Sequence, residues 1–332
     1  MLQHRLSRWI LSIILALGTA IAILSAQAPA PAQTPVTLAS AGLTLEEVGP
    51  GVYSLLASTD FPPAGPNIAI CNGSIIVGDQ GVIVVDAFQT EELADLIFKT
   101  VADLTDQPIR YVVNSHYHFD HSGGNAAAQM RGYPILGRGP IREFMLSRNR
   151  ENDPNVTPPD VIVQESGTLW LGDRSVELTE FDGHSGGTDL VLYIPDADVL
   201  IAGDLLFSQR IPYLGDANIR LWQATLDQLA QRYPNATIVP GHGPLSDVRD
   251  LMALQDYFQD LKALALDWKE AGLSQAAAIE QTPLPAAYQD YTFQGLWTNN
   301  LEVAYRQITL DQDDTASIQR FFAQQDPLLK AL

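Results

Sequence analysis

The sequence predicts an α/β layered domain, and three observations support this prediction. From Leu43 onward, short β-branched runs alternate with helical patterns that place apolar side chains on one face. The 332 residues are 46% hydrophobic and 17% charged, which is enough apolar material to bury a large core. The single cysteine, Cys71, excludes an internal disulfide and a zinc site built from cysteines. The fold is therefore expected to be stabilised by its apolar core rather than by disulfides.

The expected elements follow in order along the chain. Two β-branched runs on either side of the turn at 78–81 predict a hairpin, and Thr90 can cap a helix whose apolar face includes Leu93 and Leu96. Further helices are expected from about Asn125, near 221–232, and from about Ser246 to Gly272. Further strands are expected at 111–113, 135–136, 161–163, 168–171, 176–181, 190–194, 199–201 and 237–239.

Residues 1–32 are predicted to be a secretory signal peptide. Arg5 and Arg8 precede the uncharged stretch 9–24, and Ala-x-Ala patterns follow, the second of which ends at Ala32. That stretch is short for a membrane crossing, which needs about 20 residues, and this favours cleavage over the alternative, a retained N-terminal anchor. We therefore expect a periplasmic or secreted protein, with residues 33–42 as a linker and membrane contact only through an uncleaved segment.

The charge balance bears on the binding partner. The chain has 39 acidic and 19 basic residues, a formal net charge of −20. Because such a surface repels phosphate backbones, a nucleic-acid partner is not expected. A small molecule is the expected partner, and the oligomeric state is left open.

The histidines predict a metal centre. Three of the six lie in the run His116-x-His118-x-Asp120-His121, directly after an expected strand. Imidazole and carboxylate are the ligands that zinc prefers when thiolate is absent. Taken singly, the other ligand candidates have ordinary loop or cap roles. Each of them, however, follows an apolar strand and a glycine, so all should meet at one sheet edge: His184, Asp204 and His242. Asp86 is expected to support ligands rather than bind metal, and Cys71 to be a buried small residue.

In chain order, the sequence carries HxHxDH at 116–121, GHS at 183–185, GD at 203–204 and PGHG at 240–243. This series resembles the metallo-β-lactamase superfamily over roughly residues 43–245. The resemblance implies an αββα four-layer sandwich with a two-metal groove along its edge, followed by a C-terminal helical segment, 246–332, packing on the core. It also implies which residues hold metal: His116, His118 and His184 the first ion, Asp120, His121 and His242 the second, and Asp204 both.

The same resemblance implies a chemistry. Two Zn²⁺ ions would generate a hydroxide near neutral pH, and Asp120, the catalytic candidate, would orient it or relay its proton. Phe61, in the loop at 58–67, would contact substrate. Asp204 and Phe207 stand where the zinc-cysteine subclass of β-lactamases has cysteine and often lysine, which counts against efficient β-lactam hydrolysis. Arg210 or Arg220 would then supply positive charge.

The function expected from the sequence is an exported dinuclear zinc hydrolase that opens a small cyclic amide or ester, such as a β-lactam or lactone. One alternative is a thioesterase of the glyoxalase II type. Another is an iron enzyme with redox chemistry on the same fold, since these ligands also suit iron and manganese. A protein that binds metal or a partner without turnover is the non-enzymatic alternative.

Overall fold

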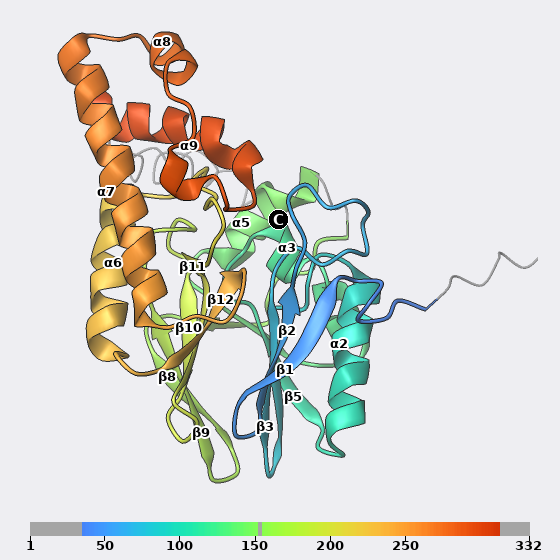
Figure 1. The fold of residues 1–332 in the computed structure, drawn as a ribbon. Coiled ribbons are helices and arrows are strands. Elements are labelled where there is room, and N and C mark those ends of the chain that lie inside the picture. The colour runs from blue at the N-terminus through green and yellow to red at the C-terminus, as the bar shows by residue number, and fades with distance from the viewer. Residues whose placement is uncertain (1–34, 152–154, 313–332) are drawn as a thin grey trace, which may run out of the picture. The chain divides into compact units, whose positions relative to one another are not determined.

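The computed structural model describes residues 35–151 and 155–312, so the predicted signal peptide lies outside the described residues. From Val36 the described chain forms one unit, in which two β-sheets face each other between outer layers of helices (Figure 1). The first sheet consists, in order across it, of β1 (Leu43–Gly49), β2 (Val52–Ala57), β3 (Gly73–Gly78), β4 (Gly81–Val85), β5 (Ile109–Val113), β6 (Ile135–Arg138) and β7 (Val161–Val163). The predicted α/β class and αββα order are confirmed.

The second sheet has the order β12-β11-β10-β9-β8. Its strands are β8 (Gly167–Leu171), β9 (Arg174–Glu180), β10 (Leu190–Ile194), β11 (Val199–Phe207) and β12 (Thr237–His242). Pairing is antiparallel except between β11 and β12, whereas the first sheet is parallel from β4 to β7. Parallel neighbours bring the carboxyl ends of several strands to one edge, where the candidate ligands lie.

The four helices that the sequence predicted are present, with boundaries close to those expected. Thr90 caps α2 (Glu91–Leu104) by accepting a hydrogen bond from the amide of Leu93 at 3.3 Å. The long helix α7 (Val248–Ala271) starts in a capping box formed by Asp247 and Asp250 and ends at Gly272, whose φ of 65° is left-handed. The others are α3 (Phe119–Ser122), α4 (Asn125–Met130), α5 (Ile141–Ser147), α6 (Ile219–Arg232), α8 (Gln275–Glu280) and α9 (Trp297–Ala304), with short turns η1 (Asn149–Glu151), η2 (Ala286–Tyr288), η3 (Gln294–Leu296) and η4 (Tyr305–Thr309).

Three large apolar clusters fill the spaces between the layers, and a smaller fourth includes Tyr117 and Phe144. One lies between the sheets and includes Ile83 and Ile201. A second packs the first sheet against α2 and α4, and the third packs the second sheet against α6 and α7. The third cluster continues without a break into the chain after α7, so residues through Tyr305 share one core with α6 and β11. Among the helices of the described ranges, none is long and apolar enough to cross a membrane.

Two strands extend further than the sequence indicated. The strand expected at 199–201 continues through Phe207 as β11, and all nine of its residues are buried. Its register against β12 shifts at Gly203, which has a φ of 54°. The strand expected at 237–239 likewise continues to His242. Asp204 and His242 therefore lie within strands rather than in the loops after them. Because the strands are paired, these two ligands have little freedom to move.

Candidate metal centre

Seven side chains that the sequence singled out meet at one edge of the sandwich, near the ends of β5, β9, β11 and β12. His116 and His118 follow β5, Asp120 and His121 lie on the single turn of α3, and His184 follows β9. Asp204 and His242 come from the neighbouring strands β11 and β12. Segments that are far apart in the sequence thus contribute to one cluster. The structure brings together every residue that was expected to hold metal.

Asp204 lies between two groups of histidines. Its Oδ2 is 3.5 Å from His116 Nε2 and 3.6 Å from His184 Nε2. Its Oδ1 is 3.1 Å from His121 Nε2 and 3.2 Å from His242 Nε2. Within each group the ligand atoms lie within 4.8 Å of one another, and the groups are His116, His118, His184 and Asp204, and His121, Asp204 and His242. One carboxylate therefore faces two potential metal positions.

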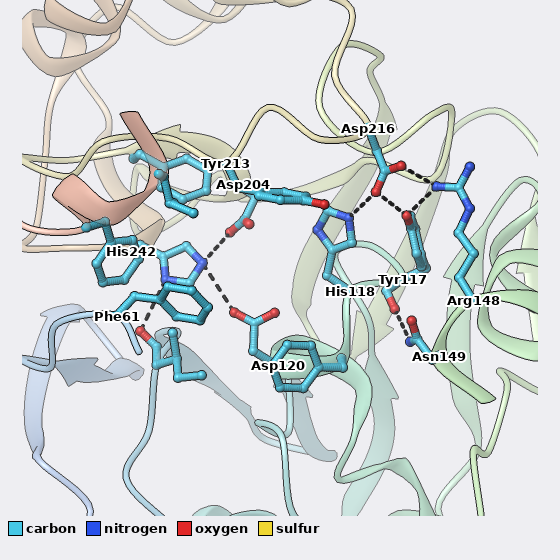
Figure 2. Close-up of a pocket in the computed structure, with 15 residues that line it drawn as sticks. Phe61, Tyr117, His118, Asp120, Arg148, Asn149, Asp204, Tyr213, Asp216 and His242 are labelled. Atoms are coloured by element: carbon cyan, nitrogen blue, oxygen red, sulfur yellow. Dashed lines mark hydrogen bonds and ion pairs between the residues drawn. The ribbon is translucent and has the colours of Figure 1, made fainter. Parts of the chain in front are cut away.

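Asp120 adds a second carboxylate beside the second group. Its Oδ2 is 3.4 Å from His242 Nε2 and 3.5 Å from His121 Nε2. Like Asp204, it also lines the open cavity above the cluster (Figure 2). Asp120 can therefore contact both a metal and a molecule in the cavity.

The cluster fits metal ions better than it fits an ordinary polar core. Both ring nitrogens of His184, and Oδ1 of Asp204, are buried without a hydrogen-bond partner among the described residues. Such orphaned atoms cost stability unless something binds them. Burial and the neighbouring His121 hold the pKa of His116 well below its usual value, so its imidazole is neutral, as a metal ligand must be. The donor set of imidazoles and carboxylates is one that suits zinc.

Hydrogen bonds orient the rings of His116, His121 and His242 so that one nitrogen of each points into the cluster. Asp86 Oδ2 accepts from His121 Nδ1 at 2.9 Å and from Ser115 Oγ at 2.7 Å. Ser115 Oγ in turn accepts from His116 Nδ1 at 3.0 Å. His242 Nδ1 donates to the Ile70 carbonyl at 3.1 Å. These bonds leave the Nε2 lone pairs free to bind metal, and Asp86 has the supporting role expected for it.

The substitution Asp86→Asn is expected to weaken zinc binding by about 10- to 100-fold, as is typical of groups that orient metal ligands. Asparagine tolerates the left-handed φ of 57° at this position, so the backbone can stay in place. Its single amide oxygen cannot, however, accept both from His121 Nδ1 and from the backbone amide of Ser115, which donates to Asp86 Oδ1 at 2.7 Å. Competition with a chromophoric zinc chelator measures the affinity. Asp103→Asn, on the exposed face of α2, is the matched control, and an unchanged affinity in Asp86→Asn would contradict the assigned role.

The His118 ring has the opposite orientation: its Nδ1 rather than its Nε2 points into the cluster. The residue that holds it, Asp216, was not found from the sequence. His118 Nε2 donates to Asp216 Oδ2 at 3.0 Å, while its Nδ1 lies 3.0 Å from His116 Nε2. Burial would raise the pKa of Asp216, but the hydrogen bond and charge of His118 and the charge of Arg148 keep it well below its usual value. Arg148 and the Tyr117 hydroxyl also bond this carboxylate (Figure 2). Asp216 is 98 positions from His118, so no local pattern could link them.

Two glycines allow the ligands to approach one another. A Cβ on Gly203 would lie 2.7 Å from the side chain of Ser115, and the residue has a left-handed φ. A Cβ on Gly241 would lie 1.9 Å from Asp204 Oδ1. A larger residue before Asp204 or His242 would therefore clash with a neighbouring side chain of the site.

A cavity of about 400 Å³ opens above the cluster. Its lining is mostly apolar, apart from the ligand side chains, Asn149 and the Tyr117–Arg148–Asp216 group (Figure 2). Phe61 lines it, as the sequence suggested, and so does Phe207. The remaining apolar lining residues include Ile70, Phe119, Tyr213, Phe293 and Leu296. The last two come from the chain that follows α7, which we call the C-terminal extension, and they have no sequence signal that links them to the site.

The two arginines expected near the substrate lie elsewhere. The Arg210 guanidinium stacks 5.7 Å from the centroid of the Phe293 ring and is not among the lining groups of the cavity. Arg220 lines a separate cavity with Lys262 and Lys269. Trp222, judged from the sequence to be a core residue, is fully buried beneath His184, with ring centroids 4.9 Å apart.

Cys71 lies close to the cluster but is not poised to react. Its thiol is within 4.8 Å of ligand atoms of Asp120 and His121, and it donates to the Asp120 carbonyl at 3.0 Å. Burial raises its pKa to about 12, so it stays protonated at neutral pH. It is a buried small residue, as expected.

Comparisons with known proteins agree with this geometry. The profile of the Metallo-beta-lactamase superfamily matches residues 67–242, more than half of the chain. The metallo-beta-lactamase type 2 of Bacillus cereus is 25% identical over 181 residues, covering 53% of this chain and 68% of that protein. The corresponding protein of Bacteroides fragilis is 20% identical over 205 residues, covering 60% and 79%.

One further relative and one solved structure are also similar to this chain. The hydroxyacylglutathione hydrolase of Hahella chejuensis is 31% identical over 134 residues, covering 40% of this chain and 46% of that protein. A solved metallo-beta-lactamase from Pontibacter korlensis has the same fold, with a TM-score of 0.57 at 23% identity, covering 65% of this chain and 99% of its own. Fold, motif order and ligand cluster agree: the chain belongs to the metallo-β-lactamase superfamily and is a metal-dependent hydrolase.

Proposed function

We propose that this protein is a dinuclear zinc hydrolase that opens a small cyclic amide or ester, of the β-lactam or lactone type. One observation carries the proposal: a single buried carboxylate, Asp204, faces two separate histidine groups. His116, His118 and His184 would hold one ion, and His121, His242 and Asp120 the other. Bound zinc would polarise the substrate carbonyl and lower the pKa of a coordinated water toward neutrality.

The chain's own groups then have defined tasks. Asp120 presents its carboxylate to the cavity, where it can orient a water molecule and hold the proton released from it. The hydrogen bonds from Asp86 and Asp216 keep His121 and His118 in position. Because Cys71 is buried and protonated, it is not a candidate nucleophile.

A thioesterase of the glyoxalase II type is the second candidate. Two observations favour it: an aspartate, Asp204, occupies the position between the two ligand groups, and the hydroxyacylglutathione hydrolase of Hahella chejuensis is similar over 134 residues. The thioester of such a substrate would be attacked in the same cavity, so the two candidates differ in the group recognised rather than in the hydrolytic step.

The assay that tests the proposal compares three substrate types on zinc-loaded protein: nitrocefin, a lactone panel and S-lactoylglutathione. Turnover of a lactone or of nitrocefin, abolished by chelation and restored by zinc, is the expected result. Turnover of S-lactoylglutathione alone would favour the thioesterase. With both metals bound, no turnover of any of the three would overturn the hydrolase proposal.

We also propose that the protein is exported and that residues 1–32 are removed on the way. The support is the order of basic start, apolar stretch and Ala-x-Ala site in the sequence. N-terminal sequencing of protein recovered from the periplasm or medium should begin at Gln33. An intact N-terminus in a membrane fraction would instead identify a retained anchor.

A further inference from the structure

The C-terminal extension reaches back into the active-site cavity at Phe293. This residue has a left-handed φ of 64°, directly before the turn η3. Its amide donates to Asp60 Oδ1 at 2.7 Å, and the same oxygen accepts from the amide of Phe61 at 2.7 Å. One carboxylate therefore fixes two phenylalanines that come from opposite ends of the chain. Their ring centroids are 5.9 Å apart.

A second attachment joins the extension to the loop after β11. Thr292 accepts from the amide of Ile211 at 3.0 Å and donates to the carbonyl of Gln209 at 3.3 Å. The Arg210 guanidinium packs over the Phe293 ring, and Arg210 is not among the residues that line the cavity. Held by Asp60 and by the β11 loop, Phe293 is a fixed part of the cavity rather than a loose tail, and only 2% of its surface is exposed.

These side chains form an apolar wall, which we define as Phe61, Phe207, Phe293 and Leu296. The wall lies beside the second ligand group. The Phe293 ring is 5.3 Å from the His242 ring, and Phe207 stacks on His242 at 4.8 Å. Phe61 is seen at this end of the cavity in Figure 2, and the polar group of Arg148 and Asp216 is at the other. Phe293 and Leu296 lie beyond residue 242, where the family match ends.

The charges in the cavity also favour an uncharged substrate group. Among the described residues that line it, Arg148 alone carries a permanent positive charge. Its guanidinium is already bonded to the Asp216 carboxylate and the Tyr117 hydroxyl. Asp120, Asp204 and Asp216 are the acidic lining groups. The protein itself therefore offers little to hold a carboxylate on the substrate, whereas the wall offers several apolar surfaces to an uncharged group.

We propose that the apolar wall is a substrate-binding subsite, with Phe293 as its central specificity-determining residue. The preferred substrates are uncharged cyclic esters or amides that carry an apolar substituent, rather than carboxylate-bearing β-lactams. This rests on the proposed function for the reaction, but the subsite itself is defined by packing alone. An alkyl or aryl group seated against Phe61 and Phe293 would place the scissile carbonyl over the ligand cluster.

The test compares γ-butyrolactone, γ-octalactone and γ-dodecalactone on zinc-loaded protein. Each added methylene that is buried against the wall should raise kcat/KM, for a total rise of about tenfold or more across the series. A γ-lactone with a carboxylate at the end of its side chain should lose that gain. In Phe293→Ala the rise should disappear, so that kcat/KM no longer depends on the length of the side chain. Met252→Ala, exposed on α7, should behave as wild type.

Because Phe293 is buried, a second variant and a second readout guard against misfolding. Phe293→Leu keeps an apolar side chain and should retain part of the chain-length preference. Binding of N-phenyl-1-naphthylamine, an uncharged apolar fluorophore, to metal-free protein reports on the subsite without turnover. It should weaken about tenfold in Phe293→Ala and be displaced by γ-dodecalactone.

The outcomes separate the two proposals. Fluorophore binding that depends on Phe293, together with no hydrolysis of any lactone, would support the subsite and count against the proposed reaction. Hydrolysis that is indifferent to chain length, or fluorophore binding unchanged in Phe293→Ala, would overturn the subsite. A preference for the carboxylate-bearing lactone would overturn it as well.

Discussion

Replacing Asp204 by asparagine should reduce kcat/KM by well over about 100-fold, more than the loss typical of residues that only orient ligands. The substitution preserves shape but removes the one negative charge that faces both histidine groups. Its amide nitrogen would point at the Nε2 atoms of one group, all of them within 3.6 Å of the present carboxylate. Zinc content measured by mass spectrometry should fall together with the activity.

The exposed aspartate Asp103, paired with Lys99 on the surface of α2, provides the matched control. Asp103→Asn should keep full zinc content and full activity, because an exposed ion pair contributes little. If Asp204→Asn were to bind two zinc ions with wild-type affinity, the idea of a carboxylate shared by both groups would be untenable. Circular dichroism of both variants verifies that the fold is intact.

Trp222→Ala should lower the free energy of unfolding by about 3 to 5 kcal/mol, as for other buried aromatic side chains cut back to alanine. The indole is fully buried between His184 and Phe258, with ring centroids 4.9 and 5.1 Å away. Its Nε1 donates to the Leu205 carbonyl at 3.0 Å, which would be left without that bond. Urea unfolding of the metal-free protein measures the change.

Trp170 offers the control of equal size, since 65% of it is exposed on β8. Trp170→Ala should change stability by less than about 0.5 kcal/mol. Because Trp222 also supports His184, its loss should weaken zinc binding at the first group, which Trp170→Ala should not. A loss of less than about 1 kcal/mol in Trp222→Ala would mean that the cavity collapses around His184 without penalty.

Local signals explain which parts of the fold were predictable. Thr90, Asp247 and Gly272 bound helices through bonds to near neighbours, so the sequence indicated those ends closely. The hairpin of β3 and β4 likewise depends on a turn of adjacent residues. The continuation of β11 to Phe207 was not predictable in the same way, because it depends on pairing with β12, where the partner of Phe207 is His242.

The same distinction applies to the site. The metal cluster could be predicted because its residues have a distinctive chemistry and spacing. Asp216 is an ordinary aspartate until it meets His118, and Phe293 is an ordinary core residue until it meets Asp60, 233 positions away. Arg210 illustrates the converse, since its charge suggested a substrate contact but its guanidinium packs on an aromatic ring instead. Residues that depend on a distant partner cannot be found by their own type.

Metal analysis tests the central claim most directly. Protein purified without added metal, and again after reconstitution with zinc, should be measured by inductively coupled plasma mass spectrometry against protein concentration. The geometry around Asp204 predicts two zinc ions per chain, lost on chelation and regained together with activity. A stoichiometry that stays at one ion or fewer after reconstitution, or iron in place of zinc in the protein as purified, would contradict the dinuclear zinc hydrolase proposed here.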